Sequence, residues 1–277
     1  MTLPTAPGVT LCAASSVGLE ATVWAMRRSM EQVRFETAVL LSDVRPEGLE
    51  ATGIAWRRID RLGSRSDYSR FMLHRLADHI ETSHVLVVQW DGFVRDGSRW
   101  SGDFLRYDYI GAVWPQFKDD WKVGNGGFSL RSKKLLEATR RIPIEREAED
   151  LSICRTHRHM LEREHGIRFA DVETARSFAY EREGTTRAEF GFHGAYNLLS
   201  ELSVETTTRL VGSLEIGVLG ARESVELLFA ALKRSHFDLA RIALEHVRAH
   251  PRVLQRVLRG FSWSEQGRRQ RASGGGN

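Results

Sequence analysis

The stretch His84–Gly92, HVLVVQWDG, decides the fold. Its first five residues form a near-continuous apolar run, which is typical of a strand buried on both faces of a parallel sheet. Asp91 and Gly92 follow almost immediately. Ligands of open α/β sheets collect at the carboxyl ends of the strands, so this acid is placed to face a ligand. An Asp-Gly turn that only ends the strand is the alternative interpretation.

Patterns on both sides of this stretch predict a sheet with covering helices. A strand over Val9–Ser15, a helix over Gly18–Val33 and a strand over Ala38–Leu41 form a βαβ opening. Further expected elements are strands at Ile54–Ile59 and Tyr107–Trp114, helices over 64–80, Ser129–Ile142 and Ala148–His165, a short strand around Ile167–Ala170 and a β-like patch at Phe190–His193. The predicted class is therefore α/β, with a mixed, mainly parallel sheet flanked by helices.

Beyond Ser203 the sequence shows helical patterns in place of the alternating strand and helix patterns. Amphipathic patterns predict helices at Ser224–Leu232 and Phe237–Ala249, and a third at Pro251–Leu258. We therefore expect a main domain over residues 1–202, a helical appendage over 203–260 and a flexible basic tail over 261–277.

Composition narrows the class of protein. The chain has 277 residues, of which 42% are hydrophobic and 27% charged, enough for a full core. Its start has no basic leader region and no apolar run reaches about 20 residues, so we expect a cytoplasmic protein without a transmembrane segment. Cys12 and Cys154 lack the spacing of a zinc or redox motif and are expected to be buried.

The net charge of +4 favours anionic ligands. Arginines are concentrated from Arg241 onward. A nucleoside diphosphate, an acidic glycan or, less favoured, nucleic acid would suit such a chain. A solvated helix face with a basic tail explains the same arginines without any ligand.

Three further motifs carry residue types that can do chemistry. Glycines at 124, 126 and 127 surround Asn125 and let a backbone approach a phosphate or a sugar, although an ordinary tight turn has the same composition. Glu149 and Asp150 open a helix, where they either serve as a general base or only favour the helix dipole. His193 lies between glycines in FGFHG and could bind a metal or phosphate, or be structural.

In their order, these motifs resemble a bacterial family of GT-A-type glycosyltransferases. The segments are QWDGF (89–93), YDYIGAVW (107–114), VGNGGFSLRS (123–132), the acidic helix start at 149–150 and FGFHG (190–194). This family is an uncharacterised domain family of polysaccharide and glycan-modification gene clusters. The resemblance covers about Val9–Leu199 and leaves out the C-terminal helices.

The resemblance implies a GT-A-like (Rossmann-like) fold and an enzyme of polysaccharide biosynthesis. Such an enzyme moves a sugar from a nucleoside-diphosphate-sugar donor to a hydroxyl acceptor, here a glycan that can be anionic, with inversion. Asp150 would be the catalytic base with Glu149 beside it, and Asp91 and His193 would hold a divalent cation, Mn²⁺ or Mg²⁺. Donor binding is assigned to Ser15, Asp43, Arg70, Gln89, Trp90, Asn125, Gly126 and Gly127.

One departure from the family pattern concerns the metal. Gln89 stands where many GT-A enzymes have the first acid of an Asp-x-Asp motif. We therefore expect the cation to be weakly bound, or replaced in part by Arg70 or Arg131.

Two other functions fit the same patterns. One is a non-catalytic GT-A-like module that binds nucleotide or an anionic polymer. The other is a nucleotidyltransferase or sugar-nucleotide hydrolase, which would want a basic triphosphate loop near the first strand, and Ala13–Ser16 offers none.

Overall fold

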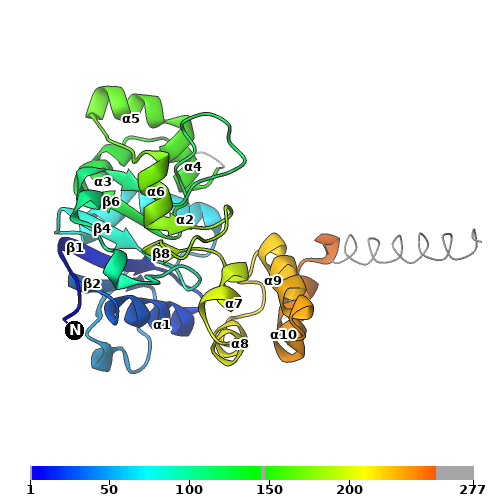
Figure 1. Cartoon of the computed structure of the whole chain (residues 1–277). Helices are drawn as coiled ribbons and strands as arrows, with labels where there is room; N and C mark the ends of the chain where they lie inside the picture. Colours follow the sequence, from blue (N-terminus) through cyan, green and yellow to red (C-terminus); the bar gives the residue numbers. More distant parts are fainter. Residues whose placement is uncertain (1, 145–146, 254–277) are drawn as a thin grey trace, which may run out of the picture. The chain divides into compact units, whose positions relative to one another are not determined.

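The computed structural model describes residues 2–144 and 147–253 (Figure 1). The chain divides into two compact units, Met1–Glu201 and Leu202–Asn277. Of the predicted C-terminal segments, residues 254–258 of the third helix and the tail over 261–277 lie outside the described residues.

The first unit is built on a six-stranded sheet in the order β3-β2-β1-β4-β6-β5. The strands are β1 (Thr5–Ala14), β2 (Arg34–Ser42), β3 (Ala55–Arg58), β4 (His84–Val87), β5 (Tyr109–Ile110) and β6 (Ser129–Ser132). The first four pair in parallel, whereas β6 is antiparallel to both β4 and β5. The expected mixed and mainly parallel sheet is confirmed.

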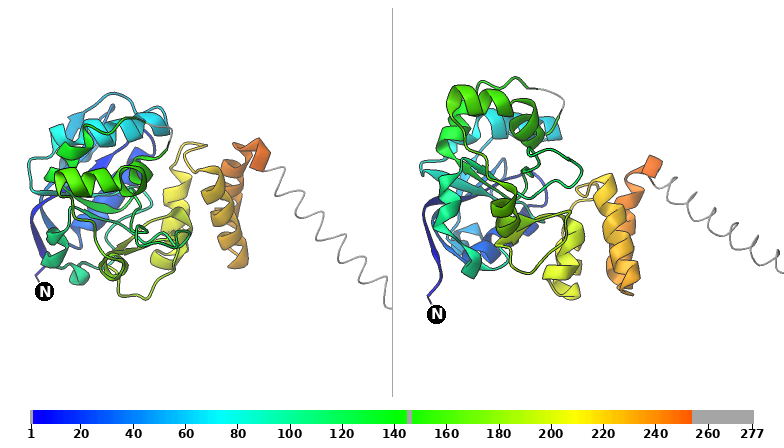
Figure 2. Two further views of the ribbon diagram at one scale, coloured as in Figure 1. Left: turned by 90° about the horizontal axis from the view of Figure 1, so that it is seen from above. Right: turned by 45° about the horizontal axis from the view of Figure 1, so that its top comes forward.

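The sheet is covered on both faces because its central strands are apolar on both sides. In β1, Leu11 and Ala13 join one buried cluster together with Met26 of α1 (Leu19–Met30). The alternate residues Cys12 and Ala14 join a second cluster, with α2 (Arg65–His74) and α3 (Lys133–Thr139). β2 and β4 alternate in the same way. Figures 1 and 2 show α1 on one face and α2 with α3 on the other.

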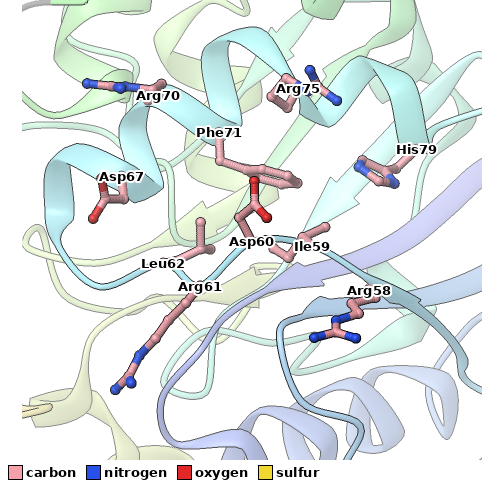
Figure 3. Close-up of a pocket in the computed structure, with 10 residues that line it drawn as sticks. All are labelled: Arg58, Ile59, Asp60, Arg61, Leu62, Asp67, Arg70, Phe71, Arg75 and His79. Atoms are coloured by element: carbon pink, nitrogen blue, oxygen red, sulfur yellow. The ribbon is translucent and has the colours of Figure 1, made fainter.

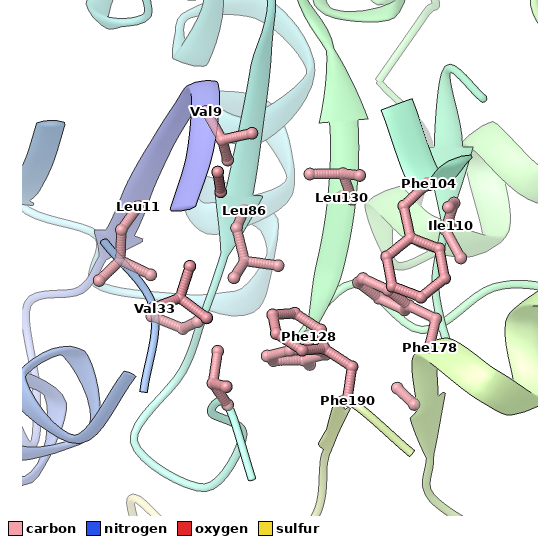
Figure 4. Close-up of a cluster of buried hydrophobic side chains, with 14 of the residues drawn as sticks. Val9, Leu11, Val33, Leu86, Phe104, Ile110, Phe128, Leu130, Phe178 and Phe190 are labelled. Atoms are coloured by element: carbon pink, nitrogen blue, oxygen red, sulfur yellow. The ribbon is translucent and has the colours of Figure 1, made fainter. Parts of the chain in front are cut away.

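Aromatic side chains extend the α1-side cluster beyond the sheet. Phe104, Phe128, Phe178 and Phe190 pack together next to Leu130 and Ile110 of the antiparallel strands (Figure 4). This packing ties α6 (Val172–Phe178) and the segment before β8 (Gly191–Phe192) to the edge of the sheet. β8 pairs in parallel with β7 (Ala179–Tyr180).

The antiparallel strand β6 corrects one prediction. Ser129–Ser132 was expected to begin a helix, but it forms a strand paired with β4, and only Lys133–Thr139 is helical. Ser132 caps that helix by accepting a hydrogen bond from Leu135 N at 3.0 Å. In the register, Ser129 lies opposite Val87, so the start of β6 adjoins the end of β4.

Other predicted elements are shorter or interrupted. The helix expected over Ala148–His165 consists of α4 (Glu149–Leu151), a π-helical segment (η5, Ser152–Thr156) and α5 (Arg158–His165). Only Tyr109–Ile110 of the predicted strand at 107–114 is a strand, and Phe169 makes only an isolated bridge to Tyr109. The helix expected over 64–80 ends at His74 and is followed by the 3₁₀ turn η2 (Leu76–His79). The remaining short elements are η1 (Leu49–Thr52), η3 (Gly97–Arg99), η4 (Gly102–Arg106), η6 (Ala195–Asn197) and α7 (Leu198–Glu201).

The second unit contains three described helices. They are α8 (Val204–Gly212), α9 (Ala221–Lys233) and α10 (Phe237–Arg248), of which the last two confirm the predicted helical pair. Ser203 caps α8, which was not predicted. Within residues 2–144 and 147–253, no helix combines the length and the apolar character needed to cross a membrane.

Gly111 offers a test of the packing between β5 and the glycine-rich segment. A Cβ at this position would lie 1.6 Å from the Gly124 carbonyl oxygen, which is backbone and cannot rotate away. We expect Gly111→Ala to lower the free energy of unfolding by about 3 kcal/mol, the upper part of the usual cost of overpacking. Urea unfolding measures it. The matched control is Gly102→Ala, where a Cβ meets nothing within 4 Å, and an equal loss in both variants would contradict the packing argument.

Candidate functional site

The acid after β4 lies in a tight turn. Gln89 and Gly92 exchange two backbone hydrogen bonds of 3.1 Å, which leaves Trp90 and Asp91 at the tip. Gly194 N donates to the Asp91 carbonyl at 2.9 Å, so the segment that follows His193 holds the turn in place. The Asp91 side chain is buried and turns inward, with Oδ1 3.5 Å from His193 Nε2. Asp91 is thus both a turn residue and a member of a polar cluster.

His193 lies between two carboxylates. Its Nε2 faces Asp91 Oδ1 and, at 3.3 Å, Gln89 Oε1, while its Nδ1 is 3.5 Å from Glu181 Oε1. Burial lowers the pKa of the imidazole, but the two acids outweigh burial and raise this pKa well above its usual range. Burial likewise raises the pKa of Glu181, yet hydrogen bonds from His193 and Asn125 leave it lowered. The ring therefore carries a positive charge at neutral pH.

Asn125 organises the glycine-rich segment. Its φ of 69° lies in the left-handed region, which asparagine tolerates better than most residues. Its Oδ1 accepts hydrogen bonds from Gly127 N at 3.0 Å and Phe128 N at 3.3 Å, which fixes the orientation of the amide. Nδ2 then lies 3.1 Å from His193 Nδ1 and donates a hydrogen bond to the Glu181 carboxylate. Glu181, which accepts from both Asn125 and His193, thus joins the loop to the histidine.

Gly126 and Gly127 are needed because protein side chains occupy the space beside them. A Cβ on Gly126 would lie 2.2 Å from Glu149 Oε1, and a Cβ on Gly127 would lie 2.0 Å from His193 Nε2. The two consecutive glycines therefore bring the acidic pair at 149–150 and the Asp91–His193 pair to opposite sides of one short segment.

In the described part of the chain, only backbone N–H groups bond the Asp150 carboxylate. Its Oδ2 accepts from Gly126 N at 3.0 Å and its Oδ1 from Leu151 N at 2.8 Å. Burial, and next the negative charge of Glu149, raise the pKa of Asp150 to about 6, against the two backbone hydrogen bonds and the more distant Arg131. A carboxylate with this pKa is ionised at neutral pH and still basic enough to accept a proton.

Glu149 has a different environment. Its Oε1 is 2.9 Å from Arg131 Nη2, and both side chains are almost fully buried. Arg131 also donates to Ser129 Oγ at 3.0 Å and to the Gly126 carbonyl at 3.3 Å. Arg131 is therefore committed to holding the glycine-rich segment and Glu149, rather than exposed to a ligand.

The remaining predicted donor residues are spread along the strand ends. Ser15 follows β1, where its N–H donates to Leu41 O of β2, and its hydroxyl bonds Val17 O at 2.6 Å. Asp43 follows β2, and its Oδ1 is buried without a hydrogen bond from the described part of the chain. Trp90 is half-buried at the turn tip. Arg70 lines a separate groove beside α2.

Metal ligands are sparse at this site. Among the described residues, no three His, Cys, Asp or Glu side chains are grouped so as to hold a metal ion. Asp91 and His193 are near each other, whereas Glu181 lies on the other ring nitrogen. Sequence reasoning missed Glu181, because it follows the two-residue strand β7, which gives no hydrophobic pattern.

The fold and site define an α/β protein with a polar site at the carboxyl end of the central strand. The family model described as "Protein of unknown function (DUF5672)" matches residues 54–193, half of the chain, and the chain belongs to this family. No curated protein sequence matches it.

The chain also has a low overall similarity to two solved structures, one of which is named as a glycosyltransferase. An active-site mutant of LgtC has 13% sequence identity and a TM-score of 0.43, with 74% of this chain and 96% of that chain covered. A glycosyltransferase involved in the glycosylation of the major capsid of PBCV-1 has 10% identity and a TM-score of 0.44, with 73% and 98% covered.

The ion pair of Arg131 and Glu149 can be tested by removing one charge. Glu149→Gln leaves a buried arginine without its counter-ion, so we expect the free energy of unfolding to fall by about 3 kcal/mol. Glu31→Gln, which breaks the exposed Arg28–Glu31 pair, is the matched control and should cost at most about 0.5 kcal/mol. Chemical denaturation compares the two variants, and equal small losses would contradict the structural role of Glu149.

Proposed function

We propose that the protein is a glycosyltransferase that moves a sugar from a nucleoside-diphosphate donor to a hydroxyl acceptor on a glycan, with inversion. The single observation that carries this proposal is the contact of Gly126-Gly127 with Asp150 on one side and His193 on the other. A proton acceptor and a cationic group are thereby held close together, and transfer of a sugar from a diphosphate needs both.

Asp150 is the proposed base. Each of its oxygens accepts one backbone hydrogen bond and keeps a further lone pair for an acceptor hydroxyl. As that hydroxyl oxygen bonds to the anomeric carbon, its proton passes to Asp150, and the bond from the anomeric carbon to the diphosphate oxygen breaks. The electron pair of that bond leaves with the diphosphate, whose negative charge then has to be stabilised.

The proposed site for that stabilisation is the Asp91–His193 side. The protonated His193 can itself donate from Nε2 to a phosphate oxygen. The same atoms also fit a divalent cation, because Nε2 faces Asp91 Oδ1 while Nδ1 is oriented by Glu181, as ligand histidines commonly are. Asp91 and a neutral His193 would hold such a cation, which would supply positive charge to neutralise the diphosphate.

The donor is proposed to lie over the ends of the first strands. Asp43 Oδ1, buried and without a hydrogen bond from the described residues, can accept from a ribose hydroxyl. Gln89 and Trp90 would border the diphosphate at the turn. Ser15, at the end of β1, would border the nucleoside.

Substitution separates the proposed base from the donor site. We expect Asp150→Asn to reduce kcat at least a hundredfold with nearly unchanged donor affinity, because the amide cannot take the proton. Asp91→Asn should instead weaken binding of donor with Mn²⁺. Turnover with a panel of nucleotide-sugars and calorimetry with the same donors measure the two effects. Wild-type turnover in Asp150→Asn would refute the base assignment, and absence of any donor binding by the wild-type protein would favour a binding module of another kind.

The pH profile gives an independent test of the same base. Because the pKa of Asp150 is raised to about 6, the carboxylate is protonated below this pH and ionised above it. We expect kcat to fall about tenfold per pH unit below pH 6 and to level off above it. Glu149→Gln removes the negative charge that raises this pKa, so the midpoint should move to lower pH. A midpoint that stays in place in an active, folded Glu149→Gln enzyme would argue against titration of Asp150.

A further inference from the structure

A basic groove lies beside α2. It encloses about 620 Å³, within the usual range for ligand pockets, and it runs between α2 and the loop that follows β3. In Figure 3, Arg70 and Arg75 extend from the helix on one side, while Arg58 and Arg61 extend from the strand end and loop on the other. None of the motif residues at Asp91, Asp150 or His193 lines it.

The walls of the groove are fixed without a ligand. Leu62 N donates to Ser16 Oγ at 2.9 Å, and Ile59 N donates to Ser42 O at 3.1 Å, which fastens the loop to the ends of β1 and β2. At the other end, Arg57 of β3 donates to the His79 carbonyl at 3.0 Å. The groove is therefore preformed, so binding would cost little ordering.

The charges at the rim are largely unused. The side chains of Arg58, Arg61 and Arg70 have no hydrogen bond or ion pair within the described ranges. Of the four arginines, only Arg75 is paired there, with Asp78 at 3.1 Å. Like charges gathered around one hollow repel one another, and an anionic ligand would relieve that repulsion.

The floor of the groove contains apolar side chains and a carboxylate, which a site for phosphate alone would not need. Ile59, Leu62 and Phe71 provide apolar surface, and the Asp60 carboxylate projects between the loop and Phe71. The Asp60 side chain has no hydrogen-bond partner among residues 2–144 and 147–253, and as a carboxylate it is free to accept from a ligand. An accepting carboxylate over apolar surface suits a group that presents both hydroxyls and C–H faces, which describes a sugar ring.

We propose that this groove binds an anionic oligosaccharide. Its carboxylate or phosphate groups pair with Arg58, Arg61 and Arg70, its hydroxyls donate to Asp60, and its ring faces lie on the apolar floor. A nucleic-acid strand fits less well, because Asp60 and Asp67 oppose a continuous phosphate backbone. The inference concerns binding alone and does not require sugar transfer.

Binding is tested by calorimetry with tetragalacturonate, a singly phosphorylated maltotetraose and uncharged maltotetraose. We expect binding of at least one charged sugar and at least tenfold weaker binding of maltotetraose. Which charged sugar binds tighter identifies the anionic group. Equal affinity for the uncharged sugar, or tighter binding of an eight-residue oligothymidylate, would overturn the proposal.

Variants locate that binding in the groove. Arg58→Gln/Arg61→Gln should weaken binding of the charged sugar at least tenfold. Arg27→Gln/Arg34→Gln makes the same charge change at exposed positions elsewhere and should change affinity less than twofold. An equal loss in both double variants would mean that only net charge matters.

Asp60→Ala separates sugar recognition from general attraction. Removal of this negative charge would strengthen binding of any anion that is held by electrostatics alone. If Asp60 accepts from sugar hydroxyls, the same change weakens binding severalfold instead. Tighter binding of the charged sugar by Asp60→Ala would therefore refute the proposed role of the groove.

The two proposals fail in different ways. Asp91→Asn should keep its affinity for the charged sugar even where it loses the nucleotide-sugar. Sugar binding in the groove without any donor binding by the wild-type protein would count against the transferase alone. Donor binding without sugar binding would count against the groove alone.

Discussion

The absence of side chains at Gly126 and Gly127 is the constraint on which the site depends. Only a bare backbone leaves room for Glu149 on one side and for His193 on the other. The same backbone then serves as a connector, because Gly126 N holds Asp150 and the Gly126 carbonyl accepts from Arg131. Elements that are far apart in sequence, the end of β4, the start of α4 and the end of β8, meet at this one segment. The close approach of Glu149 and His193 to this segment, and the hydrogen bonds of Gly126 to Asp150 and Arg131, therefore depend on this one pair of glycines.

The buried charges around this segment are balanced unequally. Arg131 and Glu149 neutralise each other, and His193 is neutralised by Asp91 and Glu181. Among the described residues, no cation contacts Asp150 and only N–H groups hold it, while the charge of Glu149 lies next to it. Burial and the negative charge of Glu149 therefore penalise the ionised form of Asp150. Asp150 is thus the carboxylate left beside the paired charges, and its raised pKa underlies the role proposed for it.

Sequence reasoning reached the sheet through its most apolar strand and reached the turn at Asp91, because both depend on local pattern. It missed β6, since Ser129–Ser132 is short and continues directly into α3, so a helical pattern covers both. It missed Glu181 because β7 has two residues and no periodicity. Sequence reasoning also could not show that Glu149 and Asp150 have different environments, because two adjacent acids at the start of a helix look alike in sequence. Only the positions of Arg131 and Gly126, 18 and 24 residues away along the chain, give them different roles.

The antiparallel direction of β6 affects how rigidly the site is held. Because β6 runs opposite to β4, its first residue adjoins the last residue of that strand, and the glycine-rich segment enters the sheet at the edge where the acid turn leaves it. No helix intervenes between this segment and the strand, so one end of the segment is clamped by the hydrogen-bond ladder. This half of the site is therefore held by the hydrogen bonds of the sheet, and its shape is set when the sheet forms.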